Sequence, residues 1–433
     1  MSQFTLSWST VSLPLNDLSS TITTDYQLGS PKAGGSDAVD SFEVIFFGTS
    51  RITTIRLLDR IVQGARDRLR SGRGPRAKLT VRFDTDTSDW SAEVFEIEVD
   101  PAEAPGTAVS GKISVKIIIR REPGWTGTGI ALPSRSTLDN SYSTAGRRIS
   151  NNPALGSFLE VRGSDLTGSL PSPIKLTLSN TSAAQRTYTR VYAASEWTGG
   201  TPLIQGETSI LSGTNITAPS FSGTGYWLSG TITATASLLG IWPIDQTLVD
   251  GSDSRWWRLI GALSHTPAHN PRLWPVIYHS DSSTVLWTGE PILLSTLSTE
   301  GLVDLGPVPI PPGESLGLSR TALRLGLWGI AKTATSIILD YFYFMPVDTL
   351  RFLDQSSQAV ATNQQVVIDE YTEDFYILQS NLAVPIWVPD GEKLMLWPGV
   401  DQRIHVLEGL SGSSDLTGQF TATVTYYPRR LTL

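Results

Sequence analysis

The chain of 433 residues is long enough for two to four domains, and charged residues make up only 17% of it. Short β-branched runs alternate with Gly and Pro, which predicts a mainly β, multi-domain protein built of β-sandwiches. A net charge of −8 argues against nucleic acid as a specific ligand, and the lack of cysteine excludes disulfides and thiolate metal sites.

The N-terminal stretch MSQFTLSWSTVSLPL has neither a basic region nor an apolar segment long enough for a signal peptide. The sequence also contains no apolar run of the roughly 20 residues that a transmembrane helix needs. We therefore expect a protein that is made and folded in a cytoplasm, is not secreted by a signal peptide, and does not insert into a membrane.

Residues 1–125 are predicted to form a first β-sandwich domain. Apolar residues alternate with polar ones at 42–46, 79–83, 95–99 and 113–119, and this period of two is typical of strands with one buried face. In the third of these segments the pattern predicts that Phe95, Ile97 and Val99 share the buried face.

One amphipathic helix is predicted between the first two of these strands. Apolar residues recur there at intervals of three and four, which places them on one helical face: Ile55, Leu58, Val62, Ala65 and Leu69. We expect this helix to cover the sheet.

The same region carries two opposite blocks of charge. Residues 51–82 hold ten Arg or Lys against Asp59 and Asp67, whereas residues 83–104 hold eight acidic residues and no basic one. The blocks can neutralise each other within one subunit, or the basic helix of one copy can meet the acidic strand of the next copy in a ring. The second interpretation gives these candidate interface residues: Arg56, Arg60, Arg66, Arg70, Asp84, Asp86, Glu96 and Glu98.

The rest of the chain is predicted to comprise three parts. Residues 126–153 are polar and aperiodic, which favours a linker or an arm. Residues 154–348 are expected to form a β-sandwich or jelly roll, and residues 349–433 a smaller β-unit that is either separate or completes an earlier sheet. Strands of the second domain are predicted at 158–161, 174–178, 187–193, 258–263, 276–278 and 337–344.

Eight of the thirteen tryptophans fall in the predicted middle region. Burial in a core or a subunit interface is the common fate of tryptophan, but an exposed indole face can also stack on the apolar face of a sugar. The candidates for glycan stacking are Trp256, Trp257 and Trp274.

Three histidines cluster in the stretch HTPAHNPRLWPVIYH. The spacing of His265 and His269 would suit a zinc site on a helix, but Pro267 and Pro271 are incompatible with that helix. A turn with exposed histidines is the favoured interpretation.

Acidic residues are adjacent at Asp369 and Glu370 and at Glu373 and Asp374, yet neighbours on a strand point to opposite faces. The sequence contains no phosphate-binding loop, nucleophile elbow, dinucleotide fingerprint or EF-hand loop. We therefore expect no catalytic residues, no cofactor and no metal. The hypothesis of a polysaccharide-cleaving enzyme is supported only by the acidic pairs and by the β-rich composition.

Several stretches resemble tailed-bacteriophage tail structural proteins of the distal tail and tail-tip type. They are the strand, helix, strand, hairpin order of residues 42–121, LPSPIKLTLSNTS with RTYTRVYAA, ILDYFYFMPVD, and the closing VPDGEKLMLWPGVDQRIHVLEG with VTYYPRR. The resemblance implies a tail-tube-like first domain that forms a homo-oligomeric ring in the virion tail or baseplate and docks to other tail proteins. It also implies an outward sandwich similar to carbohydrate-binding modules, synthesis in the host cytoplasm, and no chemistry.

Two alternatives remain open beside this one. The protein could be a glycan-binding, adhesin-like virion protein that recognises host-surface glycans, or a capsid-associated structural protein.

Overall fold

The computed structural model describes residues 3–29, 37–48, 51–71, 76–83, 88–101, 112–150, 157–180, 186–197, 203–210, 214–217, 226–245, 256–294, 300–310, 323–379, 382–386, 390–410 and 419–431. The chain forms two compact units. Unit 1 comprises Met1–Ile130, Thr167–Ser172 and Tyr427–Leu433, and unit 2 comprises Ala131–Leu166 and Pro173–Tyr426. Antiparallel sheets dominate both units, which confirms the prediction of a mainly β, multi-domain protein.

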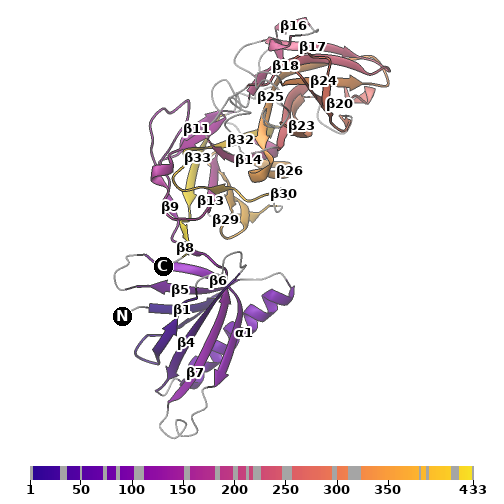
Figure 1. Cartoon of the computed structure of the whole chain (residues 1–433). Coiled ribbons are helices and arrows are strands. Elements are labelled where there is room, and N and C mark those ends of the chain that lie inside the picture. Colours follow the sequence, from indigo (N-terminus) through magenta and orange to yellow (C-terminus); the bar gives the residue numbers. More distant parts are fainter. Residues whose placement is uncertain are drawn as a thin grey trace. The chain divides into compact units, whose positions relative to one another are not determined.

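Unit 1 is one nine-stranded antiparallel sheet with a single helix, α1 (Arg51–Ser71), on one face (Figure 1). The order of the main strands is β2-β1-β5-β6-β7-β4-β3, and β8 pairs with β6 and β34. The strands are β1 (Gln3–Trp8), β2 (Val11–Pro14), β3 (Thr21–Gln27), β4 (Ala38–Phe46), β5 (Ala77–Arg82), β6 (Trp90–Pro101), β7 (Ile113–Arg121), β8 (Trp125–Gly127) and β34 (Arg429–Arg430).

The helix packs onto the sheet through the predicted apolar face, with one exception. Leu58, Val62 and Ala65 are buried, but Leu69 is 64% exposed, so the last turn is not covered. The helix approaches β1 closely because Gly64 has no side chain: a Cβ there would lie 2.2 Å from the Trp8 indole.

A β-bulge changes which residues of β6 face the core. Val94 lies opposite Arg121 and Glu96 lies opposite Arg120, so Phe95 is an extra residue in the strand. Val94 and Ile97 are buried as a result, whereas Val99 is 39% exposed. Ile97 and Val99 still share one side of the strand, opposite the buried Ile119 and Ile117, so the predicted common face is wrong only for Phe95.

A buried ion pair joins β4 to β7. The Arg121 guanidinium donates from Nε to Asp40 Oδ2 at 2.6 Å and from Nη2 to Asp40 Oδ1 at 3.2 Å. It also donates to the carbonyl oxygens of Glu122 and Gly29 and lies 3.9 Å from the centre of the Trp125 ring. Both charged side chains are fully buried, so each depends on the other for neutralisation.

Unit 2 contains two β-sandwiches, of which the first is interrupted by the second. One sheet of the interrupted sandwich has the order β10-β12-β32-β14-β26-β30, with β10 (Ser134–Arg135), β12 (Phe158–Val161), β32 (Gln402–Leu410), β14 (Arg186–Trp197), β26 (Arg351–Val360) and β30 (Asp390–Gly391). The other has the order β11-β33-β13-β27-β28-β29, with β11 (Arg147–Ser150), β33 (Gln419–Tyr426), β13 (Ser172–Ser179), β27 (Gln365–Asp369), β28 (Asp374–Gln379) and β29 (Leu382–Pro385); β31 (Met395–Leu396) pairs with β13.

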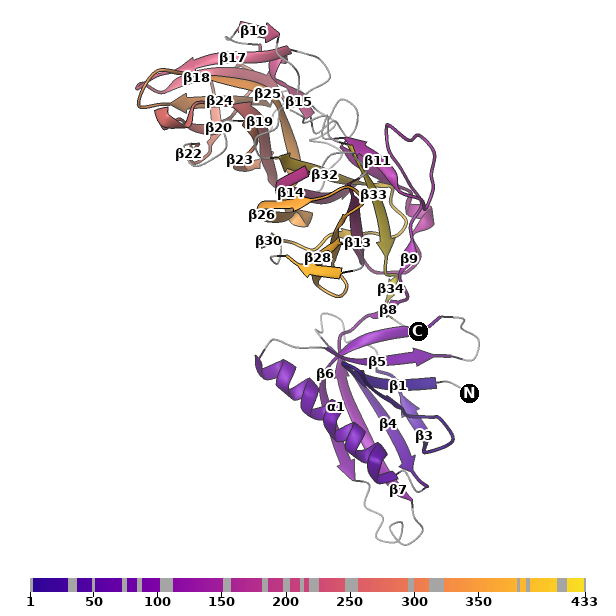
Figure 2. The ribbon, with the colours of Figure 1, turned by 180° about the vertical axis from the view of Figure 1, so that it is seen from behind.

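The inserted sandwich lies between these parts in the chain and is seen from two sides in Figures 1 and 2. One of its sheets has the order β16-β17-β25-β19-β23, with β16 (Thr214–Thr217), β17 (Tyr226–Ile232), β25 (Thr335–Pro346), β19 (Trp256–Ser264) and β23 (Glu300–Pro309); β15 (Leu203–Gln205) pairs with β25. The other has the order β18-β24-β20-β21, with β18 (Ser237–Pro243), β24 (Arg324–Ile330), β20 (Arg272–Tyr278) and β21 (Val285–Thr288); β22 (Ile292–Leu293) pairs with β20.

A buried cluster joins the two sandwiches. Tyr192 of β14 and Leu407 of β32 pack in it with Ile260 of β19 and with Tyr341 and Met345 of β25. Strand alternation explains this arrangement, because the opposite faces of the same strands point into the two sandwich cores.

The observed division of the chain differs from the predicted one. Residues 126–150 contribute short strands to the sheets instead of forming a free linker. The strands after residue 349 complete the interrupted sandwich, which is one of the two arrangements predicted for this segment. All six strands predicted between residues 154 and 348 lie within observed strands. Their distribution over two sandwiches was not predictable, because local periodicity does not tell which distant strands pair.

The ion pair between β4 and β7 gives a stability prediction. Asp40→Leu should destabilise unit 1 by about 3–5 kcal/mol, because it leaves the Arg121 charge buried without a counter-charge. Urea denaturation, with hydrogen exchange followed in β4 and β7, measures the loss. The double variant Asp40→Leu with Arg121→Met removes both charges and should recover much of it; a double variant less stable than Asp40→Leu would contradict the interpretation.

Candidate interaction surfaces

The outer face of α1 is a basic surface. Arg56, Arg60, Arg66 and Arg70 are all exposed, and at 3.6 residues per turn they fall on one side of the helix, opposite the buried Leu58. Within the described part of the chain, none of these four arginines forms an ion pair. Asp59 and Asp67 are exposed on the same side, so the helix presents a net positive charge to solvent.

The predicted acidic partners of this surface lie in two places. Asp84 and Asp86 lie outside the described residues. Glu96 and Glu98 lie on β6, where Glu98 is exposed and Glu96 pairs with Arg120 at 3.4 Å. Of these two strand residues, therefore, only Glu96 forms an ion pair with a basic residue of its own chain.

Two further ion pairs of unit 1 also use arginines outside the helix. Arg82 Nε lies 2.5 Å from Asp89 Oδ1, and Arg76 binds Glu93. Burial raises the pKa of the Glu93 carboxyl, and the nearby Arg76 guanidinium opposes that rise. Part of the acidic block is thus neutralised within the subunit, but not by the four helix arginines.

The three tryptophans predicted to stack on glycans lie in three different environments. Trp257 is fully buried and packs edge-on against Phe344, so it cannot reach a ligand. Trp256 is its neighbour on β19, points to the opposite side and is 46% exposed. Trp274 is partly buried on the outer side of the β18-β24-β20-β21 sheet.

On that outer side Trp274 belongs to an aromatic face, which comprises Leu238, Ile241, Trp274, Val276, Tyr278 and Trp328. Trp274 of β20 and Trp328 of β24 lie directly opposite each other in the strand register, and both are partly exposed. The Trp328 indole Nε1 donates to the Tyr278 hydroxyl at 2.6 Å. Gly326 provides the space for this contact, since a Cβ there would lie 2.4 Å from the Tyr278 ring.

Trp328 and Tyr278 belong to this face although the residue pattern did not predict them. In β20 the inward residues Leu273 and Ile277 and the outward residues Trp274 and Tyr278 are all apolar or aromatic, so the period of two is hidden. The one usable signal was Gly326 beside Trp328, because a glycine inside a strand often marks a close approach.

The histidine cluster forms neither a metal site nor a set of exposed rings. His265 is only 5% exposed and its Nε2 lies 2.7 Å from the Leu294 carbonyl oxygen, so the prediction of exposed histidines is wrong for this residue. His269 lies in the 3-10 turn η4 (Pro267–His269), and His279 is partly buried near Asp281. Among the described residues, no group of three or more His, Asp or Glu is arranged to hold a metal ion.

The adjacent acidic residues have separate structural partners. Arg351 donates to both carboxylate oxygens of the buried Glu370 at 2.8 Å, and Asp369 Oδ1 accepts the backbone N–H of Tyr371 at 3.1 Å. Glu373 pairs with Lys393 at 2.6 Å. These contacts stabilise the turn between β27 and β28. They leave no two carboxylates that converge on one point in this turn.

A buried polar chain links the two sandwiches of unit 2. Glu196 Oε1 lies 2.5 Å from His405 Nε2, and His405 Nδ1 lies 2.6 Å from the Tyr343 hydroxyl. Burial raises the pKa of Tyr343 far above its ordinary value, so the phenol keeps its proton. Tyr343 belongs to the cluster that joins the two sandwiches, and the three hydrogen-bonded side chains connect β14, β32 and β25.

Within the described residues, no helix is long and apolar enough to cross a membrane.

The contact between Gly326 and Tyr278 can be tested by a double-mutant cycle. Gly326→Ala should cost about 1–3 kcal/mol, because the new methyl group displaces the Tyr278 ring from Trp328. The same change in a Tyr278→Leu background should cost clearly less, since the clashing ring is then gone. Thermal unfolding measures both values; equal costs in the two backgrounds would contradict this packing.

Comparisons with known proteins do not assign the chain to a family. No protein-family profile and no curated protein matches it. Among solved structures it is similar to a chain of the phage p2 baseplate in its activated conformation, with 10% identity over 99% of this chain and 98% of that chain, at a TM-score of 0.28. It is also similar to a chain of a subviral particle of infectious bursal disease virus, with 11% identity over 70% of this chain and 80% of that chain, at a TM-score of 0.17. TM-scores this low establish no common fold.

Proposed function

We propose that this protein is a non-catalytic structural component of a virion, that its place is the tail of a tailed bacteriophage, and that unit 1 assembles with copies of itself into a ring. The observation that carries this proposal is the row of exposed arginines on α1, which have no ion-pair partner among the described residues. The resemblance of the sequence to distal tail and tail-tip proteins agrees with this role.

The complementary surface is the exposed end of β6. Glu98, Val99 and Asp100 are exposed there. On the helix, the exposed Ile52 lies on the same side as Arg56. The helix surface thus carries a net positive charge beside an apolar side chain, and the end of β6 carries Glu98 and Asp100 on one face and Val99 on the other. A head-to-tail contact between copies joins unlike surfaces and closes into a ring when the rotation allows.

Other virion tail proteins are the second class of partner in this proposal. A ring continues a tube only by docking to the components above and below it, so the faces that the ring leaves open receive neighbours of different sequence.

Charge reversal tests the proposed ring contact. Replacing Arg56, Arg60, Arg66 and Arg70 by Glu should convert the oligomer to a monomer without unfolding it, because all four side chains are exposed. Sedimentation velocity and native mass spectrometry give the oligomeric state. The matched variant with Lys at the same four positions keeps the charge and should still assemble.

A second variant, with the charge reversed on β6, complements the helix variant. A variant with Glu98→Lys and Asp100→Lys should not associate with itself but should associate with the Glu-substituted helix variant, since the charges are exchanged. Assembly should weaken as the salt concentration rises, because the screening length falls from about 8 Å at 0.15 M to about 3 Å at 1 M. A wild-type chain that stays monomeric at high concentration would contradict the ring.

The aromatic face favours a second candidate function, the binding of glycans on a host surface. Trp274 and Trp328 lie opposite each other on adjacent strands and are partly exposed, so their ring faces can pack against the C–H face of a sugar. The Trp328 N–H is already bonded to Tyr278, which holds the indole in place.

A glycan array tests this second candidate. Trp274→Ala and Trp328→Ala should each weaken binding by about tenfold or more, a loss of about 1.4 kcal/mol. Trp256→Ala is the matched control, because this residue is exposed but lies on the other sheet of the inserted sandwich. Loss of binding in Trp256→Ala alone would show that the aromatic face is not the site.

A further inference from the structure

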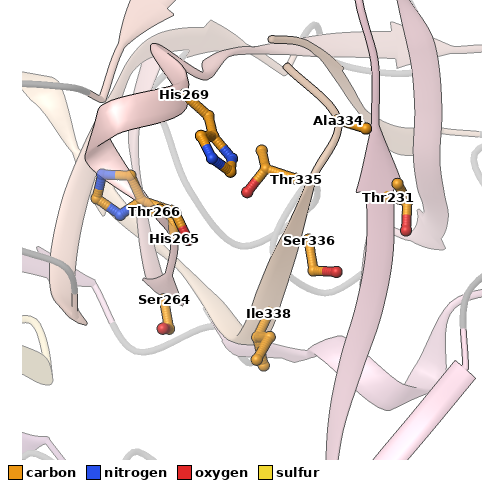
Figure 3. A pocket seen from close by; sticks show the side chains of 9 residues that line it. All are labelled: Thr231, Ser264, His265, Thr266, His269, Ala334, Thr335, Ser336 and Ile338. Atoms are coloured by element: carbon orange, nitrogen blue, oxygen red, sulfur yellow. The ribbon is translucent and has the colours of Figure 1, made fainter.

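A pocket lies at one end of the inserted sandwich, where β17, β19, η4 and β25 meet (Figure 3). Its volume of about 430 Å³ falls within the range of about 300–1,000 Å³ that is typical of small-molecule sites. Five of the side chains that line it carry hydroxyl groups: Thr231, Ser264, Thr266, Thr335 and Ser336. None of the described residues that line it is Asp, Glu, Lys or Arg.

Two imidazoles of the wall have ring nitrogens without a partner. His265 Nε2 lies 2.7 Å from the Leu294 carbonyl oxygen, which only accepts, so Nε2 carries the proton and donates it. In the neutral ring Nδ1 of His265 is then a bare acceptor, and it is buried without a hydrogen-bond partner among the described residues. His269 Nδ1 is likewise buried and without a partner there, and Figure 3 shows the His269 ring directed into the pocket.

These groups exclude most classes of ligand on physical grounds. An anion would find no cationic side chain, and a cation would find no carboxylate among the lining residues. A purely apolar ligand would cover the hydroxyls of the wall without offering them hydrogen bonds, at a cost of about 1–3 kcal/mol for each buried group. What fits is an uncharged molecule that both donates and accepts several hydrogen bonds.

We propose that this pocket binds one ring of an uncharged saccharide. Sugar hydroxyls both donate to and accept from the Ser and Thr hydroxyls of the wall, and the His269 ring, which is directed into the pocket, contacts the ligand. The Ile338 side chain, which also lines the pocket, provides the apolar contact for the C–H face of the ring. The site is separate from the aromatic face, which lies on the other sheet of the same sandwich, and it does not depend on ring assembly by unit 1.

Saturation-transfer NMR on the full-length protein tests the site, with glucose, galactose, rhamnose and N-acetylglucosamine as separate probes. At least one of these sugars should receive saturation from the wild-type protein. Ser336→Trp should weaken that binding by at least about tenfold, because the exposed Ser336 lies at the start of β25 and an indole there fills the pocket without entering the core. His269→Ala should weaken binding by a smaller factor.

Two control variants distinguish binding in this pocket from binding elsewhere on the protein. Ser283→Trp adds the same side chain at an exposed position in the turn between β20 and β21 and should bind like the wild type. Trp328→Ala should also keep the signal. A loss in Trp328→Ala but not in Ser336→Trp would place the sugar on the aromatic face and overturn the pocket proposal, while the glycan candidate would stand. Absence of saturation transfer to all four sugars would overturn it as well.

Discussion

Strand β14 carries the constraint on which the rest of unit 2 depends. It pairs on one side with β26 and on the other with β32, both of which follow the inserted sandwich in the chain. Its two faces serve two cores, since Val191 and Ala193 point into the interrupted sandwich and Tyr192 and Ala194 into the cluster shared with the inserted sandwich. A strand with both faces buried tolerates no shift in register, because a shift by one residue would exchange the two sets of side chains.

The geometry of the insertion explains how the chain meets this constraint. Leu203 and Tyr343, near the two ends of the inserted segment, are register partners on β15 and β25. The inserted sandwich therefore begins and ends at neighbouring points, which is the condition under which one domain can interrupt another without distorting it. The hydrogen-bonded chain from Glu196 through His405 to Tyr343 then adds directional contacts to an otherwise apolar junction.

The candidate functions use different physical interactions in different units. Unit 1 offers exposed charge on α1 and β6, which acts over several ångströms, sets orientation and weakens with salt. The inserted sandwich offers an aromatic face and a pocket of hydroxyl and imidazole groups, which act only in direct contact. A chain that assembles through one unit and binds small ligands through the other needs no catalytic residues for either task.

Much of the strand content was predictable from the sequence, as the alternation of Phe42, Val44 and Phe46 shows, because a period of two follows directly from strand geometry. The candidate sites were predictable only in part. The exposure of Arg56, Arg60, Arg66 and Arg70 follows from the helical period, but the environments of Trp256 and Trp257 depend on which face of β19 meets the core. The bulge at Phe95 also left no mark in the residue pattern.

Local periodicity and composition were enough to predict the mainly β fold class, the position of α1, the separation of charge in unit 1 and most strand positions. The interruption of one sandwich by another, the position of Trp328 beside Trp274, and the placement of His265 and His269 at a pocket of hydroxyl groups follow from the tertiary structure alone. These features arise from pairing and packing between segments far apart in the chain. The free energy of such contacts depends on which segments meet in space, and local periodicity carries no information about that.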